Sequence, residues 1–137
     1  MNHSKSKLRV LVIDDDLEVL DTYEDILDVH NIECIKCADG ISGLELLATD
    51  EFDLIILDNN MPEIDGTEVS RLARFTLAKN SVPIIMISGI NNNLNTLECM
   101  TLGLNGFLKK PITPTMLIDT IKRAIKQFKE DGQCVWV

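Results

Sequence analysis

The sequence is short of basic residues and has no long apolar run, and each shortage excludes a class of protein. Thirteen lysines and arginines stand against 22 aspartates and glutamates, which gives a formal net charge of −9. Binding to nucleic acid or to an anionic membrane surface needs a basic footprint, so neither is expected. No run could span a bilayer, and the start MNHSKSK leads into no apolar signal-peptide core. We therefore expect no direct nucleic-acid contact, no membrane insertion and a cytoplasmic location.

Cysteines and aromatic residues are also few. Four Phe, one Tyr and one Trp predict an aliphatic core, and the four cysteines carry no clear signature of a disulfide or zinc site. Cys34 and Cys37 form a C-x-x-C, but they lie in a strand-like segment, where residues three apart point to opposite faces. A zinc site would need two more nearby ligands. Free thiols agree with a reducing cytoplasm.

The chain also lacks any linker rich in proline, glycine or serine. Its length suits one domain, which we expect over residues 8–130, between a flexible N-terminal tail (1–7) and a C-terminal tail (131–137). We expect no effector domain after the last helix. Cys134 and Trp136, in the C-terminal tail, could dock onto the body of the domain.

Short apolar runs alternate with longer segments of helical spacing, five times over. The expected strands are residues 8–13, 32–37, 53–57, 82–88 and 106–109. The helical positions expected to face the core are Leu17, Leu20, Tyr23 and Leu27; Ile41, Leu44 and Leu47; Val69, Leu72, Ala73 and Leu77; Leu94, Leu97 and Leu104; and Leu117, Ile121, Ala124, Ile125 and Phe128. This alternation predicts right-handed βαβ units, a parallel sheet and an α/β fold. The first and third strands are apolar throughout, as in strands covered by helices on both faces.

Polar groups follow four of the five expected strands. These groups are Asp14-Asp15-Asp16 after the first strand, Asp58-Asn59-Asn60 after the third, Ser88-Gly89 after the fourth and Lys109-Lys110-Pro111 after the fifth. The carboxyl ends of parallel strands share one edge of the sheet, where ligands bind. The sequence therefore predicts that acids, a hydroxyl and an amine converge at that edge.

Converging carboxylates repel each other and need a cation or raised pKa values to coexist. Oxygen ligands from two loops suit Mg²⁺. One carboxylate can then act as a nucleophile toward phosphorus, while a hydroxyl and an ammonium group hold the phosphoryl oxygens. Asp58, Ser88 and Lys110 would supply nucleophile, donor and cation. Pro111 is compatible with a cis bond that would turn Lys110 inward, although the sequence does not specify the isomer.

In this order, V-I-D-D-D, D-N-N-M-P-E-I-D-G, Ser88-Gly89 and G-F-L-K-K-P resemble the receiver domain of two-component response regulators, in its stand-alone form. The resemblance runs from Leu8 to about Phe128. It implies a doubly wound, flavodoxin-like (βα)5 sheet with strand order 2-1-3-4-5.

The resemblance also implies a role for each site residue. Asp58 would be the phosphoacceptor, and Lys110 would pair with the phosphate. The carboxylates of Asp15 and Asp58 and the backbone carbonyl of Asn60 would bind Mg²⁺, while Asp14 would contact the metal through water or support the site. The Ser88 hydroxyl would follow the phosphoryl group, and Phe107 would be the switch aromatic. Serine replaces the commoner threonine at position 88, and Phe107 lacks the hydroxyl of a tyrosine. Ile90 is apolar, and we hypothesise that it slows the hydrolysing water.

The implied function is a signalling switch rather than a turnover enzyme. A sensor histidine kinase or a histidine phosphotransfer protein would supply the phosphoryl group to Asp58, which would later be lost by slow hydrolysis. The face made by the fourth helix, fifth strand and fifth helix would then change. The signal would pass to a downstream protein target or by onward phosphotransfer, and phosphorylation could drive dimerisation.

Two other readings of the strand ends were weighed. Asp14-x-Asp16 resembles the catalytic pair of haloacid-dehalogenase-like phosphatases, but that function would leave Asp58 and Asn60 without a role and the chain has no room for a cap. The second alternative is a nucleotide- or flavin-binding domain of similar topology. The sequence contains no glycine-rich phosphate loop, which disfavours it. Asp16 is expected to cap the first helix, and residues 91–93 the fourth.

Overall fold

The computed structural model describes residues 7–89 and 94–131 and contains one five-stranded parallel sheet flanked by helices. The elements are β1 (Arg9–Ile13), α1 (Leu17–Val29), β2 (Glu33–Cys37), α2 (Gly40–Thr49), β3 (Leu54–Asp58), α3 (Gly66–Arg71) with a π-helical turn η1 (Leu72–Thr76), β4 (Ile84–Ser88), α4 (Thr96–Thr101), β5 (Gly106–Lys109) and α5 (Pro114–Asp131). The strand order β2-β1-β3-β4-β5 and the doubly wound α/β architecture confirm the predicted fold.

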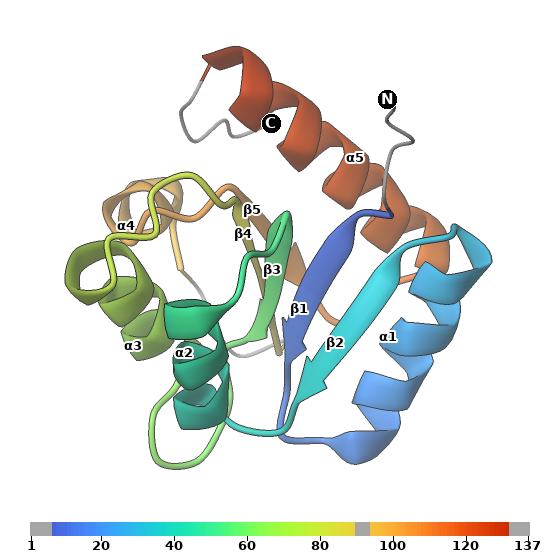
Figure 1. Ribbon diagram of the computed structural model, residues 1–137, viewed down its shortest axis with the longest axis horizontal. Coiled ribbons are helices and arrows are strands. Elements are labelled where there is room, and N and C mark those ends of the chain that lie inside the picture. Colours follow the sequence, from blue (N-terminus) through green and yellow to red (C-terminus); the bar gives the residue numbers. More distant parts are fainter. Residues whose placement is uncertain (1–6, 90–93, 132–137) are drawn as a thin grey trace.

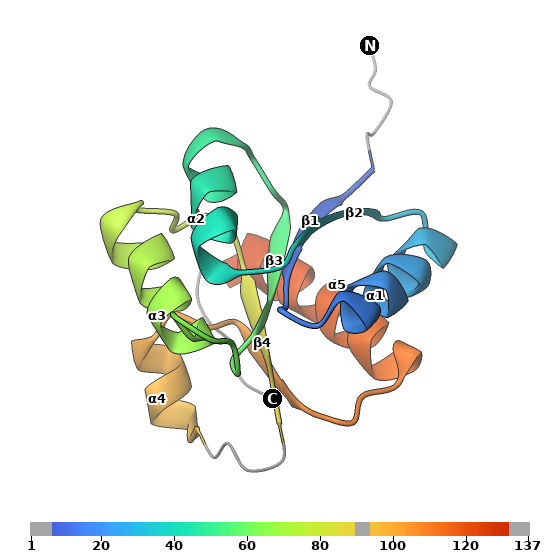
Figure 2. The ribbon, with the colours of Figure 1, turned by 90° about the horizontal axis from the view of Figure 1, so that it is seen from below.

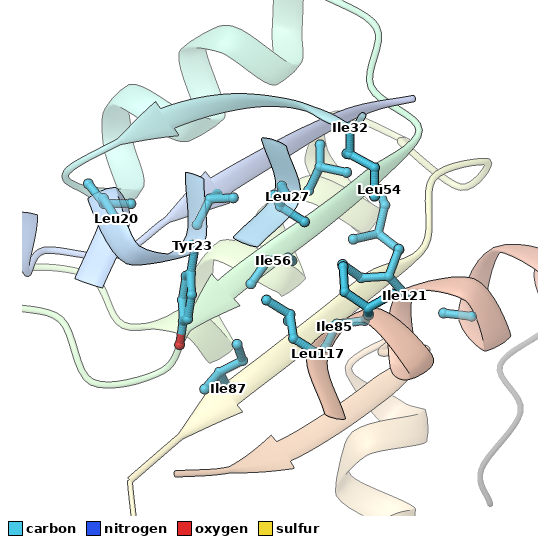
Figure 3. Close-up of a cluster of buried hydrophobic side chains, with 14 residues drawn as sticks. Leu20, Tyr23, Leu27, Ile32, Leu54, Ile56, Ile85, Ile87, Leu117 and Ile121 are labelled. Carbon is cyan, nitrogen blue, oxygen red and sulfur yellow. The ribbon is translucent and has the colours of Figure 1, made fainter. Parts of the chain in front are cut away.

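The sheet separates two buried layers. Helices α1 and α5 cover one face, and α2, α3 and α4 cover the other, as Figures 1 and 2 show from two directions. Val10, Val12, Ile56 and Ile85 face α1 and α5, and Leu11 lies in the other layer. Figure 3 shows the first layer, in which aliphatic side chains from three strands meet Leu20, Tyr23 and Leu27 of α1 and Leu117 and Ile121 of α5. Strands β1, β3 and β4 are therefore buried on both faces.

Three helical positions that were expected to face the core are exposed, so those predictions are wrong. Leu17 is 65% exposed, Ile41 48% and Leu97 71%. Each lies in the first turn of its helix. In α2 the buried positions of the first turns are instead Gly40 and Gly43, because these glycines let the helix approach the side chains of Val69, Ile64 and Ile13.

Helix caps agree with the prediction at the first helix and differ at the fourth. The carboxylate of Asp16 accepts the backbone N–H groups of Glu18 and Val19, which confirms it as the cap of α1. Helix α4 is capped by Asn95, in a reciprocal capping box with Glu98. The cap of α4 is thus Asn95 and not one of residues 91–93, which lie outside the described residues.

The third helix does not run as one regular α-helix. It continues from α3 into the wider turn η1, and the chain then turns at Ala78, whose φ is +56°. Arg74, in this turn, is buried. Cys34 and Cys37 pack in different layers, and the cysteines at 34, 37 and 99 are free thiols. In the described part of the chain, no helix is both long and apolar enough for a transmembrane span.

Candidate functional site

The acids predicted to converge do so at the carboxyl edge of the sheet. Asp58 is the last residue of β3, and Asp14 and Asp15 directly follow β1. Asp14 is 2% exposed and Asp58 3%, whereas Asp15 is exposed. One carboxylate oxygen from each of the three lies within 4.8 Å of the others. The cluster thus has two buried members and one at the surface.

The turn from β1 into α1 fixes the position of Asp14. Its backbone N–H donates to the carbonyl of Cys37 at 3.1 Å, which extends the β1–β2 pairing by one bond. Its Oδ1 accepts the N–H of Asp16 at 2.9 Å. Its Oδ2 is buried and accepts no hydrogen bond from the described residues. A buried carboxylate oxygen without a donor is costly, so this atom is suited to a cation.

Lys110 enters the cluster from the end of β5. Its N–H donates to the carbonyl of Ser88 at 2.7 Å, and the bond between Lys110 and Pro111 is cis. Its Nζ lies 3.1 Å from Oδ1 of Asp58 and 3.9 Å from Oδ2 of Asp14. One ammonium group therefore serves two buried carboxylates, and the net charge of the cluster stays negative.

The electrostatics of the cluster follow from burial and like charge. Burial raises the pKa of Asp14 to about 6. The hydrogen bond from the N–H of Asp16 lowers this pKa, whereas the negative charge of Asp58 raises it further. Burial likewise raises the pKa of Asp58, and the contact with Lys110 only partly offsets it. Burial lowers the pKa of Lys110, but the hydrogen bond and charge of Asp58 outweigh it and the pKa is raised. A bound cation would relieve this repulsion.

The predicted switch residues lie on the two neighbouring strands. Ser88 ends β4, is fully buried, and its hydroxyl donates to the carbonyl of Gly89 over a long 3.4 Å. In the sheet Asp58 is opposite Ile87, and Ser88 is opposite Lys109. Phe107 is half-buried in β5 and packs against the layer under α4. Within residues 7–89 and 94–131, the Ser88 hydroxyl makes only this long hydrogen bond.

The segment after Asp58 contains one residue that the sequence analysis missed. Asn59 is 5% exposed; its carbonyl accepts the N–H of Gly66 at 3.1 Å and its side-chain oxygen accepts the N–H of Thr67 at 3.1 Å. It thus ties the acceptor loop to the first turn of α3. Asn60, the next residue, is exposed. The sequence did contain a signal for this role: Asn59 is a polar residue that lies between the acid Asp58 and the Asp65-Gly66 pair at which α3 begins.

The donor set fits a hard divalent cation. It consists of three carboxylates and includes no sulfur or imidazole. Two of the carboxylates have a buried oxygen that accepts no hydrogen bond within the described residues: Oδ2 of Asp14, and Oδ1 of Asp58, whose one close neighbour is the ammonium group of Lys110 in an ion pair. Oxygen-only ligands at a partly open position are what Mg²⁺ takes, since it retains waters. The residues that would hold it are Asp14, Asp15 and Asp58. The structure brings Asp14, Asp15, Asp58 and Lys110 together at the carboxyl edge of the sheet. Ser88 ends β4 and Asn60 follows β3 at the same edge, whereas Phe107 lies within β5, opposite Met86. Ile90 lies outside the described residues.

Comparison with known families agrees with this geometry. The family model described as "Response regulator receiver domain" matches residues 10–122. The chain belongs to this family. Receiver domains are parts of two-component response regulators, so the predicted family is confirmed. Asp16 serves as a helix cap and is not among the three clustered acids, so the phosphatase alternative gains no support.

Relatives and solved structures agree with the family. This receiver domain is 29% identical over 122 residues to the regulatory protein VanR of Enterococcus faecium, covering 89% of the chain and 52% of VanR. It is 29% identical over 128 residues to the transcriptional regulatory protein YclJ of Bacillus subtilis, covering 93% and 55%. The chain thus spans about half the length of the curated relatives it matches.

Solved receiver domains have the same fold over most of their length. A CheY-like receiver domain protein from Methanospirillum hungatei superimposes with a TM-score of 0.84 at 27% identity, covering 93% of this chain and 100% of that one. The chemotaxis response regulator CheY4 of Vibrio cholerae gives 0.79 at 29% identity, covering 86% and 98%.

Proposed function

We propose that this receiver domain is a phosphoacceptor switch in which the carboxylate of Asp58 takes a phosphoryl group from a phosphohistidine. The observation that carries the proposal is the buried Asp58 carboxylate with the Lys110 ammonium group 3.1 Å away. Two further carboxylates and a buried hydroxyl lie around it. A sensor histidine kinase or a histidine phosphotransfer protein would be the donor, as the family implies.

The transfer needs one nucleophile and one leaving group. A carboxylate oxygen of Asp58 attacks phosphorus, and the new P–O bond forms as the P–N bond to the donor imidazole breaks. The imidazole nitrogen leaves with the bonding electron pair, so no proton has to be taken from Asp58 in its ionised form. Lys110 favours that ionised form and is placed to pair with the negative phosphoryl oxygens.

Mg²⁺, when bound, supplies positive charge for the phosphoryl oxygens. Asp14, Asp15 and Asp58, with the backbone carbonyl of Asn60, would hold it. The raised pKa values of Asp14 and Asp58 follow from their burial and mutual repulsion, so the ion would also keep both carboxylates ionised near neutral pH.

Phosphorylation would be read out through β4, α4 and β5. The Ser88 hydroxyl, with only a long bond to Gly89, would move to a phosphoryl oxygen, and Phe107 would change its position in β5. The face formed by α4, β5 and α5 would then bind a downstream protein, pass the group onward or form a dimer. Water would slowly hydrolyse the acyl phosphate, which makes the domain a switch and not a turnover enzyme.

Intact mass spectrometry tests this proposal. The protein is incubated with Mg²⁺ and phosphoramidate, whose P–N bond stands in for that of phosphohistidine. We expect one added phosphoryl group that hydroxylamine removes, as for an acyl phosphate, and that EDTA prevents. Asp58→Ala should abolish the adduct, while the matched control Asp65→Ala, a helix cap of α3, should keep it. An adduct that persists in Asp58→Ala would overturn the proposal. If that adduct were instead lost in Asp14→Ala while Asp58→Ala kept it, the result would favour the phosphatase alternative.

A further inference from the structure

The chain contains a single tyrosine, and this residue lies in the buried layer between the sheet and the helices α1 and α5. Tyr23 comes from the middle of α1, and it is 5% exposed. Figure 3 shows its ring extending from α1 across the layer toward Ile87, with the hydroxyl group at the far end. Because Ile87 is the last residue but one of β4, the hydroxyl is directed toward the carboxyl edge of the sheet.

Asp14 and Asp58 project to the same side of the sheet as Tyr23. Val12 and Ile56 face the layer that contains Tyr23. Alternate residues of a strand face the same side, so the side chains two positions further on, those of Asp14 and Asp58, share that side. Burial raises the pKa of Tyr23, and the negative charges of Asp14 and Asp58 raise it further. The phenol therefore lies beneath the two carboxylates and within reach of their charge.

Packing alone does not require a hydroxyl group at position 23. Leucine or phenylalanine would fill this aliphatic layer without a polar group, whereas a buried phenol costs free energy unless it finds a hydrogen-bond partner. Within residues 7–89 and 94–131, the Tyr23 hydroxyl makes no hydrogen bond. In the same part of the chain, the buried Oδ2 of Asp14 accepts none. A donor and an acceptor that both need a partner thus lie on one side of the sheet.

We infer that Tyr23 is a positioning residue of the candidate cation site. Its hydroxyl donates toward the Asp14 carboxylate through one bridging water, since the two groups make no direct bond. The bridge would hold Asp14 in the orientation that its role as a cation ligand requires, because hydrogen bonds to metal-binding carboxylates fix their orientation. This inference rests on the proposed function for the identity of the site. It adds a residue of α1 to a site that is otherwise built from strand ends.

Magnesium binding to the full-length, unphosphorylated chain tests the inference. Isothermal titration calorimetry with MgCl₂ gives the Kd, and Tyr23→Phe, which keeps the ring, should raise it about 10-fold. The matched control Thr22→Val removes the neighbouring hydroxyl of α1, which donates to the carbonyl of Glu18, and should leave the Kd unchanged. Urea unfolding in EDTA should give Tyr23→Phe a midpoint no lower than that of wild type, which separates the loss of cation binding from a loss of folding.

The ring of Tyr23 gives a second readout that a purely structural role would not move. Isotope labelling of tyrosine rings gives one set of NMR signals, because the chain has one tyrosine. These signals should shift during the Mg²⁺ titration with the Kd found by calorimetry. In Asp14→Asn they should shift little, even at Mg²⁺ concentrations that saturate this variant. Ultraviolet absorbance is less specific, because Trp136, which lies outside the described residues, absorbs in the same range.

Two results would overturn the inference. Equal Kd values for wild type and Tyr23→Phe would mean that the hydroxyl contributes nothing to the cation site. Ring signals that stay in place at Mg²⁺ saturation would mean that Tyr23 does not contact the site. The proposed function fails in a different way, by the absence of the phosphoramidate adduct on Asp58. A chain that forms no adduct, yet binds Mg²⁺ with a Kd that depends on the Tyr23 hydroxyl, would support the positioning role and exclude the phosphotransfer.

Discussion

The ammonium group of Lys110 lies 3.1 Å from Oδ1 of Asp58, although 52 positions separate the two residues in the chain. The contact depends on two neighbouring features. The strands β3, β4 and β5 pair in parallel, and the N–H of Lys110 bonds to the carbonyl of Ser88 at the end of β4. The sheet thus holds a cation over a carboxylate that burial would otherwise favour in its protonated form.

Lys110→Met should therefore slow adduct formation from phosphoramidate by about 10–100-fold, because it removes the cation that pairs with the phosphoryl oxygens. Lys109→Met removes the same charge one residue away and should change the rate less than threefold, roughly the effect of a screened surface charge. Time-resolved intact mass gives both rates. Equal rates for the two variants would remove Lys110 from the proposed mechanism.

The raised pKa of Asp14 predicts a pH dependence of stability in the ion-free protein. An unfolded Asp14 loses its proton near pH 3.8, and the folded one near 6. Between these values the folded state binds more protons, so the free energy of unfolding should fall as the pH rises from about 4 to about 6. A pKa difference of this size corresponds to about 3 kcal/mol in total for this buried group.

Asp14→Asn should reduce that slope, leaving the part that comes from Asp58, whose pKa burial also raises, and should make the ion-free protein more stable than wild type at pH 7.5. Urea unfolding in EDTA at a series of pH values measures it. Asp25→Asn, at an exposed position of α1, is the matched control and should keep the wild-type slope. If Asp14→Asn keeps the full wild-type slope, Asp14 does not cause it.

Much of the fold and site could be predicted because the relevant rules depend only on order along the chain. Alternating strand-like and helical segments predict a parallel sheet, and the residues that follow its strands share one edge. The sequence alone therefore predicted that Asp14, Asp58, Ser88 and Lys110 lie at the same edge. The fold and the family are confirmed. The roles in phosphorylation and Mg²⁺ binding stay predictions.

What could not be predicted depends on contacts between distant segments. Helical spacing identified an apolar stripe but not where the sheet ends beneath it, so Leu17 and Leu97, in first turns, were assigned to the core and are exposed. The burial of Arg74 was not predicted, because its acceptors lie in loops up to 31 positions away. The turn η1 breaks the regular period at the same place.

Gly66 is expected to be sensitive to the smallest substitution. A Cβ at this position would lie 2.8 Å from both the Cα of Asn59 and the carbonyl oxygen of Asp58, which are backbone atoms that cannot move aside alone. Gly66→Ala should lower the free energy of unfolding by about 1–3 kcal/mol, as overpacking does. Gly89→Ala meets only the flexible amide of Asn60 at 3.0 Å and should cost less. Urea unfolding of both variants checks this order, which the reverse ranking would contradict.

Arg74 is expected to be the most costly polar residue to replace outside the carboxylate cluster. Its guanidinium group donates to the carbonyls of Gly103, Lys79 and Val82 and to the side-chain oxygen of Asn105, and so joins the loop before β4 to the loop before β5. Gly103 has a φ of +76°, and a Cβ on this residue would lie 2.9 Å from Nε of Arg74, so a larger residue does not fit there.

Replacing this fork with a single ammonium group should leave several of its buried acceptors unpaired. Arg74→Lys should therefore lower the free energy of unfolding by about 2–4 kcal/mol, even though the charge is kept. Arg71→Lys is the matched control three residues earlier: its side chain is half exposed and pairs with Glu68, so the change should stay within about 0.5 kcal/mol. Urea denaturation at pH 7.5 measures both. If Arg74→Lys unfolds at the wild-type midpoint, charge alone suffices there and the planar geometry of the guanidinium group contributes nothing to the junction.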